Sequence, residues 1–472
     1  MRESAHVDLQ FEMERIGAEK QLWSKGDCII AAVSGGPDSM ALLTALQRLA
    51  PAEQLTIIAA HVNHGFRIAE SKQELDMVSE YCSKLGVVCE TTVLDMPAYI
   101  EETGMNGQSA SREQRYAFLH SVAEKHGAAR IALAHHADDQ AETVLMRMIR
   151  GTGMAGLAGI PIRRAEKNVE LIRPLLRMKK LDIIRYCEEQ SIPYCIDSSN
   201  NERYYFRNIA RLGILPYLSQ YNPQLSQSLV RIAEVAEAEN EWMDAQSAEW
   251  FKQLAVISEG QCSVGCKELT KLPVALQRRL IKLILNYVSA GEDSVSFEGI
   301  ETIRAAAADQ ASSTWKLDIG AGMRCIREYD QLRIGVIVTP AEDDYSYSVD
   351  ESMSSLTVAP TDWTIHFAEL PDGQSCKPAS RYEACFDQSL LAFPLTVRNR
   401  RPGDRIQVLG LNGSKKVQDM FVDEKIPPSE REQYPLLFDR EGRLLWIPGI
   451  RRSSHALLSE ATRSIIHISL RR

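Results

Sequence analysis

A strand, a glycine-rich turn and a helix follow one another directly near the start of this sequence. The apolar run at residues 28–33 has the length and composition of a buried parallel strand. The turn at 34–39 reads Ser-Gly-Gly-Pro-Asp-Ser, and residues 40–46 predict a helix. Backbone N–H groups of such a turn and the positive end of the helix point to one spot, which suits a phosphate group. The stretch therefore predicts a phosphate-binding loop at the end of a parallel strand.

The candidate phosphate ligands are the six residues of this loop: Ser34, Gly35, Gly36, Pro37, Asp38 and Ser39. Adjacent glycines let a bulky anion approach the backbone closely, and the serines add hydroxyl donors. A carboxylate beside phosphates requires a metal ion or a donor between them, so we expect one near Asp38. A Walker A loop is excluded, because the chain contains no Gly-Lys followed by Ser or Thr.

Strands and helices alternate through the first 215 residues. Apolar runs predict strands at 55–62, 87–94 and 129–134, and helices are predicted at 70–85, 109–126, 137–150 and 179–190. This alternation favours an α/β fold with a doubly wound parallel sheet. Ligands of such sheets bind beyond the carboxyl ends of the strands. The glycine-rich loop, a motif from His61 and a motif from His135 all fall there.

Several polar residues at this edge are candidates for the site. His61 and His64 straddle a strand end, where hydrogen bonding is favoured over zinc. Asp138, Asp139 and Glu142 open a helix; capping explains them, and so does a role as Mg²⁺ ligands.

Two arginine pairs lie on predicted helices: Arg112 with Arg115, and Arg207 with Arg211. Arginine can neutralise the transition-state charge of nucleotidyl transfer, while a solvated helix face is the plainer explanation. Aromatic residues at 204–206 would suit stacking on unpaired bases, and core packing explains them equally well.

A Gly-x-Gly-x-x-Gly match at 151–156 does not indicate a dinucleotide site. That interpretation requires a strand before the glycines and a helix after them. Here a predicted helix precedes them and a Gly-Ile-Pro break follows, so we predict a flexible loop near the site.

The length of 472 residues indicates two or three domains. We expect a catalytic domain at 1–215, a helix-rich middle domain at 216–340 and a small, mostly β domain at 346–472. No apolar run of membrane-spanning length and no secretory signal are apparent, which predicts a cytoplasmic protein. The ten scattered cysteines are then expected to be reduced thiols, and Cys262 with Cys266 is too sparse for zinc.

The net charge of −9 counts against nucleic-acid binding for the chain as a whole. The charge is uneven, however. Residues 163–185 carry eight basic and three acidic residues, and residues 398–416 carry six basic and one acidic. Local basic clusters matter more than the total for a polyanionic partner.

Taken in order, the motifs at 34–39, 61–67, 111–116, 134–143, 150–157, 173–176 and 197–211 closely resemble those of the tRNA(Ile)-lysidine synthetases, within the ATP pyrophosphatase or PP-loop superfamily. Residues 397–405, 413–416 and 447–451 resemble the C-terminal domain of the long form. The segment 216–340 matches no motif of that family.

The resemblance implies an ATP-dependent ligase that forms a C–N bond. ATP would adenylate the C2 oxygen of the wobble cytidine in the isoleucine tRNA with a CAU anticodon, releasing pyrophosphate. The ε-amine of free L-lysine would then attack C2 and expel AMP, giving lysidine. The attacking amine must be neutral, so a nearby carboxylate or desolvation is needed.

The resemblance also implies roles for individual residues. The six loop residues, with His61, His64, Arg67 and His135, would bind ATP, and Asp38 and Asp139 would place Mg²⁺ or the lysine amine. Catalytic roles fall to Asp38, Asp139, Arg112, Arg115, Arg207 and Arg211. The tRNA would be held by Arg207, Asn208, Arg398, Arg400, Arg401, Arg405, Lys415 and Lys416. The sequence leaves a monomer and a homodimer open. The basic cluster at 398–416 motivates the hypothesis that residues 216–472 reject methionine tRNA by reading the acceptor region.

Three other functions remain open. A tRNA 2-thiolation enzyme on the same scaffold needs a cysteine pair or an iron–sulfur cluster, and the loops here offer no Cys-x-x-Cys. An ammonia-using synthetase would not need the basic cluster at 398–416. A nucleotide-sensing or RNA-binding module without catalysis could lose Asp38 or Asp139, and both are present.

Overall fold

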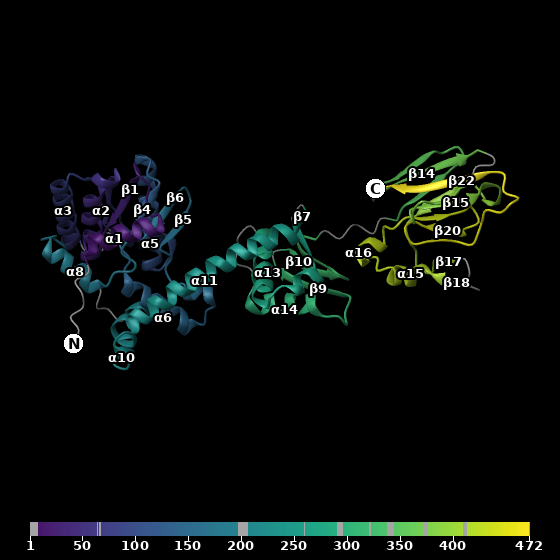
Figure 1. The fold of residues 1–472 in the computed structure, drawn as a ribbon. Coiled ribbons are helices and arrows are strands. Elements are labelled where there is room, and N and C mark those ends of the chain that lie inside the picture. Colours follow the sequence, from purple (N-terminus) through teal and green to yellow (C-terminus); the bar gives the residue numbers. More distant parts are fainter. Residues whose placement is uncertain are drawn as a thin grey trace. The chain divides into compact units, whose positions relative to one another are not determined.

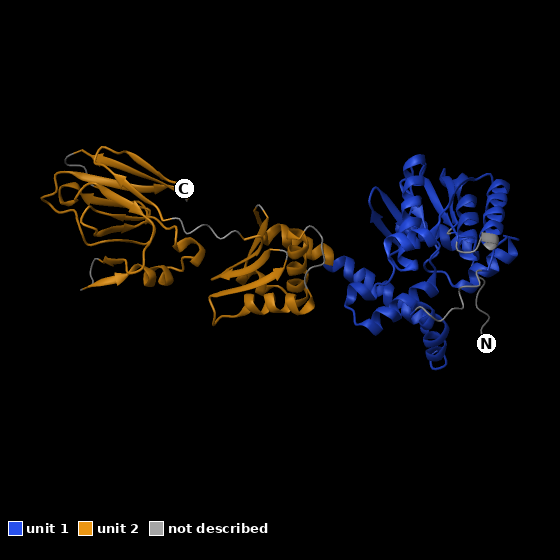
Figure 2. Cartoon of the chain, turned by 180° about the vertical axis from the view of Figure 1, so that it is seen from behind, with its two compact units in different colours: residues 1–243 blue, residues 244–472 orange. Residues whose placement is uncertain are grey.

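The computed structural model describes residues 8–471 apart from 64, 66–67, 197–205, 259, 290–295, 321, 338–343, 360, 362, 372–375 and 409–412. The chain divides into two compact units, residues 1–243 and 244–472 (Figure 2). The boundary between them lies within helix α11 (Leu225–Leu254). The three domains expected from the sequence, with boundaries near 215 and 340, stay a prediction.

The first unit is built on a six-stranded sheet with the strand order β3-β2-β1-β4-β6-β5 (Figure 1). Its strands are β1 (Cys28–Val33), β2 (Thr56–Asn63), β3 (Val88–Val93), β4 (Arg130–Ala132), β5 (Arg163–Glu166) and β6 (Val169–Ile172). β3, β2, β1, β4 and β6 pair in parallel, which confirms the predicted α/β fold.

The edge strand β5 departs from the prediction of an all-parallel sheet, because it pairs antiparallel with β6. Only residues 167 and 168 separate the two strands, and Lys167 has a positive φ of 53°. A connection this short can form a hairpin but not the long crossover that parallel strands need. Both strands lie in a segment, residues 163–173, that is rich in basic residues and has no long apolar run, so the sequence did not predict them.

Helices cover both faces of the sheet. They are α1 (Leu9–Lys20), α2 (Pro37–Glu53), α3 (Ile68–Leu85), α4 (Met96–Thr103), α5 (Gly107–His126), α6 (Ala137–Arg150), α7 (Met154–Leu157), α8 (Lys180–Glu189), α9 (Phe206–Ile209) and α10 (Leu215–Ser219), with a π-helical turn at Ala210–Ile214. The predicted helices are confirmed, and the eight-residue α4 was not predicted.

Alternate residues of β1 enter two different apolar clusters. Ile29 and Ala31 pack with residues of α1, α2 and α8, whereas Ile30 packs with Leu119 of α5 on the opposite face. A strand with both faces buried reads as a continuous apolar run, as 28–33 does. This double burial fixes the strand that leads into the glycine-rich loop.

Residues 244–337 of the second unit contain the expected helices, α12 (Cys266–Lys271), α13 (Val274–Val288) and α14 (Phe297–Ala308). They also contain a five-stranded antiparallel sheet that the sequence analysis did not predict. Its strands are β7 (Val256–Ser258), β8 (Gln261–Gly265), β9 (Thr314–Gly320), β10 (Met323–Glu328) and β11 (Gln331–Gly335), in the order β7-β8-β11-β10-β9. β9 alternates exposed and half-buried residues, the period-two signal that could have revealed it.

From residue 344 the described chain is mostly β, as predicted. One sheet has the order β12-β16-β19-β20-β21, a second β13-β14-β22-β15, and β17 pairs with β18. The strands are β12 (Ser346–Val349), β13 (Ser355–Val358), β14 (Trp363–Leu370), β15 (Glu383–Asp387), β16 (Leu395–Arg398), β17 (Arg405–Gln407), β18 (Ser414–Lys416), β19 (Leu436–Phe438), β20 (Leu444–Ile447), β21 (Arg451–Arg452) and β22 (Ile465–Arg471), with short helices α15 (Val417–Asp423) and α16 (Pro428–Arg431). Fully buried Trp446 lies in the apolar core that both larger sheets share.

The prediction that all ten cysteines are free thiols is wrong for one pair. Cys376 and Cys385 form a disulfide, with their Cα atoms 6.3 Å apart, a separation that such a bond spans. The other eight cysteines are free thiols. The pairing depends on how the chain before β15 folds back on that strand, which residue spacing does not show. In the part of the chain that the structure describes, no helix is both long and apolar enough to cross a membrane.

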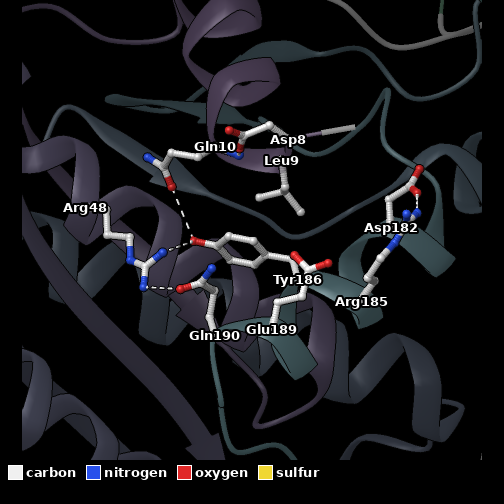
Figure 3. Close-up of a pocket in the computed structure, with 9 residues that line it drawn as sticks. All are labelled: Asp8, Leu9, Gln10, Arg48, Asp182, Arg185, Tyr186, Glu189 and Gln190. Carbon is white, nitrogen blue, oxygen red and sulfur yellow. Dashed lines mark hydrogen bonds and ion pairs between the residues drawn. The ribbon is translucent and has the colours of Figure 1, made fainter. Parts of the chain in front are cut away.

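Helix α8 is fixed along α1 and α2 by a polar cluster around Tyr186 (Figure 3). The buried Tyr186 hydroxyl lies 3.3 Å from Gln10 Oε1 and 3.5 Å from an Arg48 guanidinium nitrogen. Arg48 also donates to Gln190 Oε1 at 2.6 Å. These residues line a hollow of about 240 Å³ in which the polar groups bond mainly to one another. The hydrogen bonds around this hollow therefore hold α8 against α1 and α2.

We expect Tyr186→Phe to loosen α8 locally. The variant keeps the ring and removes the hydroxyl contacts, so local opening should become easier by about 1 kcal/mol, or about fivefold faster amide exchange in α8. Hydrogen exchange of peptides from residues 180–189 measures this. Tyr221→Phe, at a ring that is 75% exposed, is the control and should leave those peptides unchanged. Equal exchange in both variants would contradict the assigned role of the cluster.

Candidate active site

The glycine-rich loop is closed by one serine. The Ser34 N–H donates to Ser39 Oγ at 3.0 Å, and Ser39 Oγ donates to the Gly36 carbonyl at 3.0 Å. Gly35 has φ of +84°, which favours glycine at that position. Ser39 is buried and therefore shapes the loop, while Ser34 lines the open side.

Helix α2 starts within this loop. Pro37 is its first residue, and the N-cap Gly36 provides no side-chain acceptor for the first-turn N–H groups. Such N–H groups, together with the helix dipole, favour an anion. The geometry agrees with the phosphate-binding loop predicted from the sequence.

The loop opens into a cavity of about 1350 Å³ at the carboxyl edge of the sheet. Residues from the ends of three strands and from α5, α6 and α8 line it, among them Ser34, Asn63, Arg115, His135, Asp139 and Lys180. The structure thus brings together the motifs that the sequence placed at this edge. His64, Arg67 and residues 197–205 lie outside the described residues.

His61, predicted as an ATP ligand, is buried beneath the cavity instead of lining it. The side chain is 1% exposed, and its Nδ1 lies 3.0 Å from the Val33 carbonyl. Burial lowers the pKa of His61, which keeps the ring neutral. The residue supports the strand end that carries the loop.

The carboxylate of Asp38 is paired with Lys180, the first residue of α8. The Lys180 Nζ atom lies 2.6 Å and 2.5 Å from the two Asp38 oxygens. His136 Nε2 lies 3.8 Å from Asp38 Oδ2 and 3.5 Å from Asp139 Oδ2, so it stands between the two acids. Asp38 and Asp139 therefore face one region of the cavity, as predicted.

Sequence reasoning missed Lys180. Lys180 begins a helix, where the helix dipole disfavours a cation. A lysine at the start of the predicted 179–190 helix is therefore unusual, and this could have marked it as a candidate site residue.

A second cluster holds the arginines at 207 and 211. Glu142 is 1% exposed, and its carboxylate accepts from Arg207 Nε at 2.9 Å and from Arg211 Nε at 2.5 Å. Arg207 also donates to Asp139 Oδ1 at 2.6 Å. These arginines are thus paired with acids of α6, which ties the segment after residue 205 to the cavity wall.

The two aspartates at the start of α6 differ in character. Burial raises the pKa of Asp138, and the nearby charges of Asp139 and Glu142 add to that rise. Burial also opposes the charge on Asp139, but His136 and Arg207 outweigh it and lower the pKa of Asp139. Neighbouring carboxyls with pKa values pushed apart are typical of acid–base sites.

The α5 arginines are in a different state. The exposed Arg112 lies over the Tyr116 ring at 4.7 Å, and Arg115 is half-buried, with its pKa lowered by burial and by the charge of Arg112. Among the described residues, neither forms an ion pair with a carboxylate, and Arg115 Nε is a buried donor with no partner. Two uncompensated cations on the cavity wall are suited to an anionic ligand.

The glycine-rich segment at 151–156 follows helix α6, which agrees with our rejection of a dinucleotide site. Its second half forms the one-turn helix α7, and Arg147 donates to the Gly156 and Gly159 carbonyls at 2.9 and 2.7 Å. The segment is therefore partly ordered by α6.

Most of the basic side chains at 398–416 that were predicted to bind tRNA form ion pairs or hydrogen bonds within the protein. Arg398 donates twice to Asp404 at 2.7–2.8 Å, lies 3.8 Å from the Phe438 ring centroid and is 14% exposed. The other engaged side chains bond to neighbouring acids or to Ser414: Arg400, Arg405 and Lys415. Arg401 and Lys416 are exposed and form no ion pair within the described residues.

A glycine-rich loop between a parallel strand and the start of a helix is typical of the PP-loop class of ATP-using enzymes. A family model described as a PP-loop domain matches residues 7–218, and one described as TilS substrate C-terminal domain matches residues 395–468. The crystal structure of a TilS C-terminal domain covers 27% of this chain and 97% of its own, with 28% identity and a TM-score of 0.25.

Similarity to curated relatives extends over nearly the whole chain. This chain is 36% identical over 438 residues to the tRNA(Ile)-lysidine synthase of Bacillus subtilis (strain 168), and the match covers 91% of each of the two chains. The corresponding protein of Geobacillus kaustophilus (strain HTA426) is 33% identical, over 92% of this chain and 93% of its own. The chain belongs to the tRNA(Ile)-lysidine synthase family and is therefore an ATP-dependent ligase.

The stability of the first unit should depend on His135 at mildly acidic pH. Burial and nearby arginines lower the pKa of His135 to about 4, with Asp139 opposing them, against an ordinary value of 6.5. As pH falls from 6.5 toward 4, the unfolded chain takes up a proton that the folded chain refuses, so stability is lost in that window. Above pH 6.5 this ring contributes no pH dependence.

We expect wild-type protein to lose more thermal stability than His135→Asn between pH 7 and pH 5. Melting curves of the full chain at both pH values measure the difference. Parallel losses in the two proteins would show that His135 titrates normally in the folded state.

Proposed function

We propose that this enzyme ligates free L-lysine to C2 of the wobble cytidine in the isoleucine tRNA with a CAU anticodon. ATP adenylates the C2 oxygen and releases pyrophosphate, and the lysine ε-amine then displaces AMP. The observation that carries the proposal is one cavity that combines the Ser34–Ser39 loop, two uncompensated arginines and two facing carboxylates. Membership of the tRNA(Ile)-lysidine synthase family supports the choice of substrate.

The residues present fit a magnesium ion. Asp38 and Asp139, on either side of His136, would supply hard oxygen ligands, the kind that Mg²⁺ prefers. When bound, the ion neutralises phosphate charge. Within the described residues, no group of three or more His, Cys, Asp or Glu side chains could hold a metal ion, so the remaining ligands would come from ATP or water.

The cavity offers positions for each step of the reaction. The Ser34–Ser39 backbone and the start of α2 would hold the pyrophosphate, and Arg112 with Arg115 would lie against the α-phosphate. Asp139, kept anionic, would attract the ammonium group of lysine. Asp138, whose pKa is raised, would accept the proton that the amine must lose before it attacks.

The tRNA contacts follow from which cations are available. Arg207 is paired with Asp139 and Glu142, which line the cavity, and would have to leave these acidic partners to reach a phosphate; Asn208 is the next residue of α9. In the C-terminal domain, Arg401 and Lys416 are the exposed candidates, whereas Arg398 serves the fold. We place the enzyme in the cytoplasm and keep both a monomer and a homodimer open.

The alternative is tRNA 2-thiolation on the same scaffold. Among described residues, Cys195 lines the cavity, and burial raises the pKa of its thiol. A raised pKa opposes formation of the thiolate that sulfur transfer requires. Thiolation needs a cysteine pair or an iron–sulfur cluster, and within the described residues Cys195 alone among the cysteines lines the cavity, so lysine stays the proposed nucleophile.

Incorporation of radiolabelled lysine tests the proposal. Purified protein with ATP should label isoleucine tRNA with the CAU anticodon and leave methionine tRNA unlabelled, with pyrophosphate released in step. Pyrophosphate release without lysine incorporation would contradict the assigned nucleophile. If no tRNA leads to pyrophosphate release, the proposal that the cavity is an active site is contradicted.

We expect Arg115→Gln to lower kcat by about 100-fold, since it removes one preorganised charge facing the reacting phosphate. Lys125→Gln is a matched control on the same helix, because Lys125 is exposed and pairs with Glu90 outside the cavity. Single-turnover lysine incorporation compares the variants. A kcat for Arg115→Gln within twofold of the control would remove this arginine from the mechanism.

A further inference from the structure

Lys180 and Asp38 form an ion pair whose two members both line the cavity. The side chains are 30% and 25% exposed, so the pair lies at the cavity surface and not in the core. A cation at the first position of a helix is opposed by the helix dipole. The pair therefore stands where a ligand in the cavity can reach both charges.

The backbone around the pair is held firmly. Cys187 Sγ, on α8, donates to the Pro37 carbonyl at 3.4 Å, one residue before Asp38. Burial raises the pKa of Cys187 to about 12, which keeps that donor protonated. The Tyr186 cluster ties the same helix to α1 and α2 (Figure 3). Lys180 is therefore held in place beside the phosphate loop by the docking of α8.

Both oxygens of Asp38 are occupied by one ammonium group. A magnesium ion that takes Asp38 as a ligand would repel that ammonium at close range and compete with it for the same carboxylate. The displaced group stays in a cavity whose loop and helix start are suited to phosphate. An ammonium group is a strong point-charge partner for phosphate oxygens.

We propose that Lys180 exchanges partners during substrate binding: it neutralises Asp38 in the free enzyme and binds a phosphate of ATP when magnesium takes Asp38. This inference rests on the proposed use of Mg²⁺-ATP in this cavity. The ammonium group then keeps Asp38 ionised and in position before the substrate arrives. After exchange, Lys180 adds a positive charge that the phosphate loop itself lacks.

The exchange predicts two effects of opposite sign in Lys180→Ala. Without the competing ammonium, Mn²⁺ alone, as a probe for Mg²⁺, should bind about fivefold more tightly. Without the phosphate contact, Mg²⁺-ATP should bind about tenfold more weakly. Lys180→Arg, which keeps the charge, should restore most of the ATP affinity. Lys179→Ala, at the exposed neighbouring N-cap residue, should match wild type in both measurements.

The experiment uses the full chain without tRNA or lysine, so that no turnover is needed. Electron paramagnetic resonance measures Mn²⁺ binding, titration calorimetry measures Mg²⁺-ATP binding, and circular dichroism establishes that each variant is folded. If wild type binds Mg²⁺-ATP and Lys180→Ala binds it equally well, the exchange is overturned while the proposed function stands. Weaker binding of both probes would also overturn it, by showing a general loss of site structure. If wild type itself fails to bind Mg²⁺-ATP, the proposed function fails too.

Should Lys180→Ala not fold, Lys180→Gln and the arginine variant carry the same test. Lys180→Gln keeps the length and polarity of the side chain and removes its charge. It should show the same opposite changes in Mn²⁺ and Mg²⁺-ATP affinity. Unchanged affinities in a folded Lys180→Gln protein would overturn the exchange.

Discussion

Charge compensation at the carboxyl edge of the sheet determines which side chains of this enzyme are available to a substrate. Glu142 is buried and takes two arginines that follow residue 205, and Asp38 takes Lys180. Arg112 and Arg115 are left facing the cavity with no carboxylate partner among the described residues. Arg115 is half-buried and its buried Nε has no partner within the described part of the chain, so an anion is the ligand that this wall can best accommodate.

Charge compensation also distinguishes basic residues of the C-terminal domain that stabilise the fold from those that are available to bind a ligand. The segment 398–416 has a strong excess of positive charge in sequence, yet Arg398 is committed to Asp404 and to the Phe438 ring. Its guanidinium connects β16 to the following turn, so removing this side chain would destabilise the fold of the C-terminal domain. Only exposed cations without such partners, such as Arg401 and Lys416, keep their charge for a polyanion.

Local patterns made the catalytic half of the chain largely predictable. The strand, loop and helix at 28–46 are contiguous in sequence, and their burial on both faces gives an unmistakable apolar run. The β5–β6 hairpin and the sheet of the middle segment escaped prediction because their strands are short, polar on one side and set among charged residues. The Cys376–Cys385 bond escaped because it depends on tertiary folding rather than on spacing.

The site shows the same division. Motifs at strand ends identified Asp38 and Asp139, and an arginine pair on a predicted helix identified Arg112 and Arg115; all four line the cavity. Pairing was not visible, so His61 was assigned to ligand binding although it supports the loop from below. The start of a predicted helix marked Lys180 as unusual, but its pairing with Asp38 was not visible because the sequence does not show that α8 lies next to α2. The packing of Tyr186 and Cys187 against α1 and α2 does so in three dimensions.

The central claim is that this cavity joins lysine to an activated cytidine. Mass spectrometry of nucleosides from the isoleucine tRNA after reaction with enzyme, ATP and lysine tests it most directly. The account predicts that the wobble cytidine gains the mass of lysine less one water, and that this product disappears without ATP. An unmodified cytidine, or one in which sulfur replaces oxygen, would contradict it.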